Sequence, residues 1–402
     1  MALLPFIKML VSLRNKELLL MLCIPAVVSS IAAAAEIPPL QGNISNKGFT
    51  RIDFCQADGN LYAFDGLDLS RYDSNSDSFA DVLAGVGSTT TKKWDPADFA
   101  FTTDANSVVL PTGLSSGFVT ADISFGFAEE KTGLAYNFFA TASRFRDDQL
   151  YANGLGTSST NTLFLVDLNG AGSRIELAFT TSNNSGALAF DAADNAYIAG
   201  ITPFGIAGLG KVDIYRISRE QLDAFADDND YTVTPDLLVN NVILAGSDSM
   251  VIDVNYNIYI GSYVGVAKII PTPDPNAFTV VEIDGDIKAN PFGFPEFIFC
   301  GITADIRAGI LYYGKSQLNQ DTYLYGPYDL QTAGIEPVTQ WPADLDGDGI
   351  VNLKDLLLFT ENFCYNDEYL RGDINQDSLV TLKDFGILAL QWLDTAPWYR
   401  AD

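Results

Sequence analysis

A stretch near the C-terminus, DLDGDGIVNLKD at residues 344–355, has the residue types and spacing of a calcium-binding loop. Such loops supply side-chain oxygens from positions 1, 3, 5, 9 and 12 and a backbone carbonyl from position 7, with glycine at position 6. The predicted ligands are the side chains of Asp344, Asp346, Asp348, Asn352 and Asp355 and the carbonyl of Ile350. We predict a Ca²⁺ site here rather than an acidic surface turn.

A second stretch of the same kind, DINQDSLVTLKD, occupies residues 373–384. Its predicted ligands are Asp373, Asn375, Asp377, the carbonyl of Leu379, Thr381 and Asp384. Ser378 stands at position 6, where a left-handed backbone favours glycine, so we expect strain of about 1 kcal/mol. This loop offers three carboxylates where the first offers four, so we predict two Ca²⁺ sites of which the first is stronger.

An apolar run that predicts a helix follows each loop, LLLF in the first half and FGILALQWL in the second. This duplication over residues 344–394 resembles type I dockerin modules, which have Asp rather than Glu at loop position 12. The resemblance implies a small all-α, EF-hand-like module that docks onto a cohesin-type partner in an assembly that degrades polysaccharides.

The resemblance also places partner contacts at loop positions 10 and 11. These residues are Leu353 and Lys354 in the first half and Leu382 and Lys383 in the second, where dockerins commonly have a Ser/Thr pair. An apolar side chain beside a cation, repeated in both halves, favours a contact patch for a partner. The alternative is that the two leucines pack between the helices.

Composition excludes several classes of chemistry. The chain of 402 residues contains no histidine, which removes Ser-His-Asp and Cys-His catalysis and His-ligated zinc. Carboxylate-pair chemistry, chiefly glycoside hydrolysis, survives this filter. The formal net charge of −28 disfavours binding to nucleic acid. The length predicts two or three domains.

The N-terminus has the order of a secretory signal. A basic segment precedes an apolar run from Leu18 to Val28, and small residues precede Glu36. We predict a signal peptide over residues 1–35 and a secreted or cell-surface protein without membrane association after cleavage. An uncleaved anchor is the alternative, although the apolar segment is barely long enough to span a bilayer.

Residues 45–335 contain a repeated pattern in which a polar residue precedes an Asn or Gly by four positions and an aromatic or apolar strand follows. The copies align on Asn60, Asn106, Gln149, Asn195, Asn257 and Gly309. Spacings of about 40–50 residues with several short strands per repeat are typical of propeller blades. We therefore predict a mainly β fold, a β-propeller of about six blades that loosely resembles secreted propeller proteins. A series of β-sandwiches is the alternative.

The domain boundaries follow from these patterns. We predict the propeller over residues 45–335, a linker over 336–343 and the dockerin-like module over 344–394. The segment Gly309–Ser316 formally matches a phosphate-binding loop, but its ILYY occupies the strand position of the other repeats. We predict no nucleotide site there.

Other candidate residues of the propeller have structural interpretations. Asp191, Asp253 and Asp305 share one repeat position, which favours hydrogen bonding to turn amides over catalysis. Cys55 and Cys300 differ in register by about 13 Å at strand rise, too far for a disulfide, so we expect buried thiols.

Two functions fit these observations. The first is a secreted, non-catalytic Ca²⁺-binding adaptor whose propeller binds glycan or protein and whose module docks onto a cohesin-type partner. The second is a propeller-type glycoside hydrolase that uses a carboxylate pair and is delivered by the same module. The recurring acids favour the adaptor, and the sequence assigns no catalytic residue.

Overall fold

The computed structural model describes most of the chain beyond residue 50, with gaps. The predicted signal peptide and residues 336–342 of the predicted linker lie outside the described residues. The described ranges are 51–86, 99–102, 104–111, 117–131, 139–146, 149–155, 161–168, 176–178, 184–202, 210–227, 233–244, 249–289, 295–320, 324–325, 328–335, 343–364, 372–375 and 379–399.

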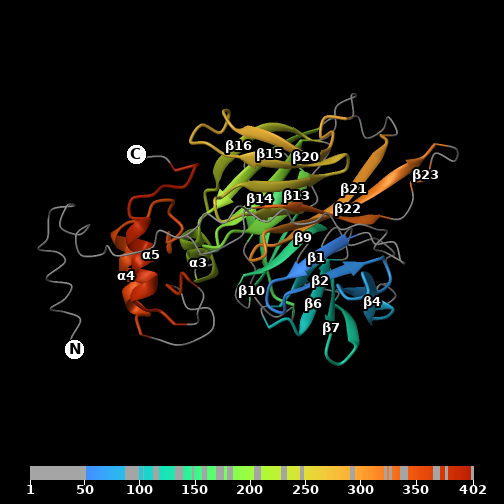
Figure 1. The fold of residues 1–402 in the computed structure, drawn as a ribbon, viewed down its shortest axis with the longest axis horizontal. Coiled ribbons are helices and arrows are strands. Elements are labelled where there is room, and N and C mark those ends of the chain that lie inside the picture. The colour runs from blue at the N-terminus through green and yellow to red at the C-terminus, as the bar shows by residue number, and fades with distance from the viewer. Residues whose placement is uncertain are drawn as a thin grey trace, which may run out of the picture. The chain divides into compact units, whose positions relative to one another are not determined.

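Six four-stranded antiparallel sheets follow one another along the chain, and they form a six-bladed β-propeller (Figure 1). Blade one consists of β1 (Arg51–Cys55), β2 (Asn60–Phe64), β3 (Leu69–Asp73) and β4 (Ser78–Leu83). Blade two consists of β5 (Ala100–Phe101), β6 (Ser107–Pro111), β7 (Phe118–Asp122) and β8 (Phe127–Lys131). Blade three consists of β9 (Phe139–Arg146), β10 (Gln149–Leu155), β11 (Asn161–Val166) and β12 (Glu176–Ala178).

The second half of the ring repeats the plan. Blade four consists of β13 (Asn184–Phe190), β14 (Ala196–Thr202), β15 (Gly210–Ile217) and β16 (Asp236–Leu244). Blade five consists of β17 (Ser249–Ile252), β18 (Ile258–Ser262), β19 (Gly265–Ile270) and β20 (Thr279–Gly285). Blade six consists of β21 (Phe297–Asp305), β22 (Ile310–Asn319), β23 (Leu324–Tyr325) and β24 (Asp329–Gly334), and β22 pairs with both β23 and β24.

The prediction of about six blades is confirmed. Each residue on which the repeats were aligned lies in the turn between the first and second strands of a blade, or begins the second strand, as Asn60 and Gln149 do. The segment ILYY starts β22, so the formal phosphate-loop match is part of a strand. The alternative of separate β-sandwiches is wrong, because neighbouring blades pack against one another around the ring, mostly through their first strands and, between blades one and two, through a shared apolar core.

The recurring aspartates order the turns that precede the second strands. Asp191 accepts hydrogen bonds from the backbone N–H of Asn195 (3.0 Å) and the hydroxyl of Tyr197 (2.9 Å). Asp253 makes the equivalent bonds to Asn257 (2.9 Å) and to Tyr259. Each carboxylate therefore satisfies turn amides that would otherwise be buried without partners, which confirms the structural interpretation for these residues.

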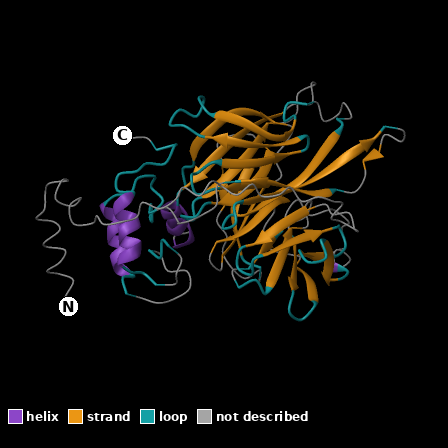
Figure 2. Ribbon diagram, in the orientation of Figure 1, coloured by secondary structure: helices purple, strands orange, loops and turns teal. Residues whose placement is uncertain are grey.

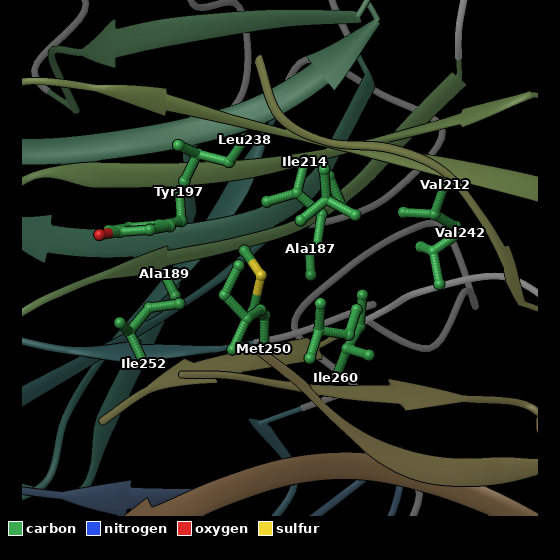
Figure 3. Packing of buried hydrophobic residues seen from close by; sticks show 14 of the residues in the cluster. Ala187, Ala189, Tyr197, Val212, Ile214, Leu238, Val242, Met250, Ile252 and Ile260 are labelled. Carbon is green, nitrogen blue, oxygen red and sulfur yellow. The ribbon is translucent and has the colours of Figure 1, made fainter. Parts of the chain in front are cut away.

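Apolar side chains fill the spaces between neighbouring blades. Between blades four and five, Ala187, Tyr197 and Ile214 pack against Met250 and Ile260 (Figure 3). The ring closes where β1 meets β21, because the Thr303 hydroxyl donates to Asp53 (2.9 Å) and accepts from the N–H of Phe54 (2.8 Å).

The two cysteines near the ring closure, Cys55 and Cys300, are buried thiols that form no disulfide among the described residues, as predicted. Cys55 packs with Tyr62 between blades one and two, whereas Cys300 packs with Ile52 on the other side of β1. Burial raises the pKa of the Cys55 thiol to about 12, so this side chain is protonated and behaves as an apolar group.

The described helices are short (Figure 2). Helix α3 (Arg219–Asp227) connects β15 to β16, and helices α4 (Leu353–Glu361) and α5 (Leu382–Leu390) follow the two acidic loops. The facing sides of α4 and α5 share a small core that includes Phe359 and Leu388. Among the described residues, no helix is long and apolar enough to cross a membrane.

Candidate calcium-binding loops

The first loop gathers its first three predicted side-chain ligands. Carboxylate oxygens of Asp344, Asp346 and Asp348 all lie within 4.8 Å of one another. The chain turns sharply between them, because Gly347 and Gly349 have φ values of 70° and 93°. These values are in the left-handed region that favours glycine, so the glycine at loop position 6 has the conformation that the sequence predicted.

Asp344, at position 1, is buried with 5% of its surface exposed. Its Oδ2 accepts hydrogen bonds from the Tyr256 hydroxyl (3.0 Å) and from the N–H of Gly349 (2.9 Å). Among the described residues, no hydrogen-bond donor reaches its Oδ1. Burial, followed by the charge of Asp355, raises the pKa of Asp344 to about 7. A buried carboxylate oxygen of this kind requires a proton or a cation.

The remaining predicted ligands of the first loop make hydrogen bonds within the loop and at the start of α4. Asp355 accepts from the N–H groups of Leu345 (2.6 Å) and Asn352 (2.7 Å), and burial raises its pKa to about 6. Asn352 caps α4 by accepting from the N–H of Lys354 (2.8 Å), and its side-chain amide donates to the carbonyl of Ile350 (3.0 Å). The structure therefore brings positions 1, 3 and 5 together and uses positions 7, 9 and 12 to order the loop and the helix start.

The second loop repeats this local plan where it is described. Thr381 caps α5 by accepting from the N–H of Lys383 (3.2 Å), and Asp384 accepts from the N–H of Thr381 (2.8 Å). Asp384 also accepts from the N–H of Asn375 at position 3 (2.9 Å). In the first loop, Asp355 accepts in the same way from the N–H of Asp346. Asp373 and Leu379, at positions 1 and 7 of this loop, are among the described residues, whereas the predicted ligand Asp377 and its neighbour Ser378 lie outside them.

The predicted partner residues lie on the surface. Leu353 is 58% exposed and Leu382 is 66% exposed, and Lys354 and Lys383 beside them are also exposed. The alternative in which the leucines pack between the helices is therefore wrong. Lys354 Nζ lies 3.1 Å from a carboxylate oxygen of Asp348, so this side chain also offsets charge in the first loop.

Residues of the propeller that the sequence did not single out complete the first loop. Besides Tyr256, the guanidinium of Arg216 donates to the carbonyl of Gly347. Tyr256 is separated from Asp344 by 88 residues, so local spacing carries no signal for this contact. The structure shows a left-handed backbone at Tyr256, with φ 59°, which is uncommon for a residue other than glycine. The sequence does not reveal this conformation.

Within the described first strands of the blades, one carboxylate is buried, that of Asp53, and it is the candidate for the alternative, hydrolytic function. Among the described residues of the first strands of the blades, the acidic side chains are Asp53 and Asp305. Burial raises the pKa of Asp53, and the Thr303 hydroxyl holds its Oδ1. Asp305 accepts from the N–H of Ala308 (2.8 Å) and so orders a turn.

No protein-family model and no curated protein matches the chain. Among solved structures, it is similar to a gluconolactonase from Xanthomonas campestris at 12% identity and a TM-score of 0.49, covering 73% of this chain and 88% of the other. It is also similar to a putative gluconolactonase at 10% identity and a TM-score of 0.45, covering 75% and 95%.

A hydrazine synthase from Kuenenia stuttgartiensis has 11% identity and a TM-score of 0.43, covering 81% of this chain and 95% of the other. At such identities and TM-scores, none of these likenesses indicates an activity. The propeller assignment rests on the strand pairing itself.

Proposed function

We propose that this chain is an exported, non-catalytic Ca²⁺-binding adaptor. Its C-terminal module takes up two Ca²⁺ ions, the first more tightly, and docks onto a cohesin-type partner in a polysaccharide-degrading or cell-surface assembly. The propeller binds glycan or protein. Neither nucleic acid nor nucleotide is a partner in this proposal, and the net charge of −28 supports the exclusion of nucleic acid.

The observation that carries the proposal is the carboxylate of Asp344. Its Oδ1 is buried and receives no hydrogen bond from the part of the chain that the structure describes, and two further carboxylates lie within 4.8 Å. Oxygen donors grouped in this way suit a hard cation such as Ca²⁺. A bound Ca²⁺ would offset the repulsion between the aspartates, and the residues that hold it would be those of positions 1, 3, 5, 7, 9 and 12.

The exposed leucines support the docking part of the proposal. Leu353 and Leu382 each stand at the first residue of a helix, beside a lysine, in two halves with the same capping geometry. Large exposed apolar side chains repeated in this way are typical of a recognition surface. The duplication offers a partner the same small patch twice.

Calorimetric titration of the full chain with Ca²⁺ tests the metal sites. We expect two binding events, of which Asp344→Ala removes the tighter and Asp373→Ala the weaker. A wild-type chain that takes up no Ca²⁺ would contradict the proposal. So would an Asp344→Ala titration that matches the wild type.

Binding to a panel of immobilised cohesin-type modules, with Ca²⁺ and with chelator, tests the partner. We expect Ca²⁺-dependent capture that weakens with Leu353→Asp and is lost when Leu382→Asp is added. Leu67→Asp is the control, because Leu67 is an exposed leucine (48%) of blade one. Capture that ignores Ca²⁺, or that survives both changes, would place the partner face elsewhere.

The alternative proposal is a propeller-type glycoside hydrolase, and it depends on Asp53. Glycoside hydrolysis needs a second carboxylate at about 5–9 Å from the first. Release of reducing ends from a panel of polysaccharides by the wild type, and its loss in Asp53→Asn, would favour the hydrolase. A wild-type chain that binds a polysaccharide without cleaving it would favour the adaptor.

A further inference from the structure

We propose that Tyr256 and Arg216 of the propeller are positioning residues of the first Ca²⁺ site, so that metal binding and docking of the module onto blades four and five are one coupled equilibrium. This inference rests on the proposed Ca²⁺ function. It adds that the first loop is completed by residues of another part of the chain, which a freely tethered module would lack.

Tyr256 fixes the orientation of the position 1 carboxylate. Its hydroxyl donates to Asp344 Oδ2 (3.0 Å), and the N–H of Gly349 donates to the same oxygen (2.9 Å). With Oδ2 held by two donors, Oδ1 is the oxygen left for a cation. A carboxylate that is already oriented loses less side-chain entropy when the metal binds. The Tyr256 hydroxyl therefore contributes to affinity without touching the ion.

Arg216 fixes the backbone of the same loop. Its side chain is 4% exposed, and its guanidinium donates to the carbonyl of Gly347 and to Asn195 Oδ1 (3.2 Å). Gly347 lies so close to Asn195 that an added Cβ would be 2.8 Å from its side chain. Gly347 is the residue between Asp346 and Asp348, so this contact holds the position 3 and position 5 ligands in place.

The segment after α5 joins the loop to the propeller. The N–H of Val351 donates to the carbonyl of Asp394 (3.0 Å), and the N–H of Ala396 donates to the carbonyl of Gly349 (2.8 Å). Trp398 follows and is buried. Its ring lies under the guanidinium of Arg216 (3.8 Å to the ring centroid) and meets Tyr256 edge to face (5.7 Å between centroids). One tryptophan therefore packs on both positioning residues.

These contacts make loop order and docking depend on each other. The backbone that must bend around the cation also bonds to Arg216 and to the segment at residues 394–396, and the position 1 carboxylate of that loop bonds to Tyr256. A cation that orders the loop strengthens the docked state, and by thermodynamic linkage the docked state binds the cation more tightly.

Calorimetric Ca²⁺ titration of the full-length Tyr256→Phe variant tests the inference. The change removes one hydroxyl and keeps the ring that packs on Trp398. We expect the dissociation constant of the first site to rise about tenfold, the size expected for one hydrogen bond to a charged group. The second site should be unchanged. Tyr263→Phe is the matched control, because Tyr263 is an exposed tyrosine (42%) of the same blade.

Thermal unfolding of the same proteins gives a second readout. In the wild type, Ca²⁺ should raise the midpoint of propeller unfolding, and this rise should shrink in Tyr256→Phe and in Arg216→Lys, which keeps the charge but not the planar fork. Equal first-site affinities in the wild type and Tyr256→Phe would overturn the inference and leave the Ca²⁺ proposal standing. A wild type without any Ca²⁺ uptake would overturn the Ca²⁺ proposal itself.

Discussion

Asp344 and Asp373 open two loops of closely similar sequence, and the structure places them in different surroundings. Both loops lead into a nine-residue helix whose first turn has a complete capping box. Asp344 is buried and accepts from Tyr256, whereas Asp373 is only half-buried. The local plan of the two halves is therefore the same, and the long-range contacts of the propeller distinguish them.

This comparison separates what a loop motif specifies from what its environment adds. The motif sets the order of oxygen donors and the helix caps, which recur in both halves. Burial and the contacts of Arg216 and Tyr256 with the first loop are additions to that plan. A ranking of the two sites by carboxylate number alone therefore omits Arg216 and Tyr256, which we expect to strengthen the first site for a separate reason.

The largest expected effect comes from adding a side chain at loop position 6 of the first half, which is occupied by Gly349. An added Cβ at Gly349 would lie 2.6 Å from the ring of Trp398, and φ is 93° there. Gly349→Ala should lower the free energy of unfolding by about 2–4 kcal/mol and weaken the first Ca²⁺ site. Chemical denaturation and Ca²⁺ titration measure the two effects.

Gly386→Ala is the control in the second half. Gly386 lies within α5, and an added Cβ there would meet nothing within 4 Å. The change should be neutral or stabilise the helix by up to about 1 kcal/mol. If both alanine variants unfold alike, Trp398 does not pack on the first loop and the difference between the halves disappears.

The next largest expected effect is the pH dependence of folding stability and of Ca²⁺ affinity at the first site. The pKa of Asp344 is raised to about 7, whereas an aspartate in an unfolded chain has a pKa of about 3.9. Between about pH 4 and about pH 7, Asp344 of the metal-free folded chain therefore holds a proton that it has lost in the unfolded chain. This contribution to stability is fully present below about pH 4 and is lost as the pH rises through about 7.

Calcium binding should show the opposite trend, because the proton must leave before the cation binds. First-site affinity should level off above about pH 7, fall by about tenfold per pH unit just below it, and fall more steeply below about pH 6, where Asp355 is also protonated. Calorimetry in buffers of different ionisation enthalpy should detect between one and two protons released at pH 6, from Asp344 and Asp355, and almost none at pH 9. An affinity that is constant over this range would mean that Asp344 is already ionised in the metal-free chain.

The blade repeats could be predicted from sequence because the turns are ordered locally. Asp191 bonds to a backbone amide four residues away, and the same spacing recurs at Asp253. The helices that follow the two loops could also be predicted, because an apolar run directly follows each loop in the sequence. Local spacing is visible in a single sequence.

The packing of the first loop against the propeller could not be predicted from local spacing. Arg216 lies 131 residues before the carbonyl that it binds, and its neighbours in sequence belong to an ordinary blade strand. Trp398 follows the predicted module, and nothing in its local sequence indicates burial against the propeller. Such contacts depend on how distant parts of the chain pack, which spacing does not encode.

The smallest expected effect is at position 6 of the second loop, and it tests whether the two halves share a backbone plan. Ser378 lies outside the described residues, but its counterpart Gly349 has a left-handed backbone, which costs a serine about 1 kcal/mol. Ser378→Gly should therefore tighten the second Ca²⁺ site about fivefold and leave the first unchanged in a calorimetric titration. The reverse change, Gly349→Ser, should weaken the first site by more than this, because its Cβ would also meet Trp398. No gain in Ser378→Gly would show that the second loop bends differently at this position, and the similarity of the halves would then be limited to their helix starts.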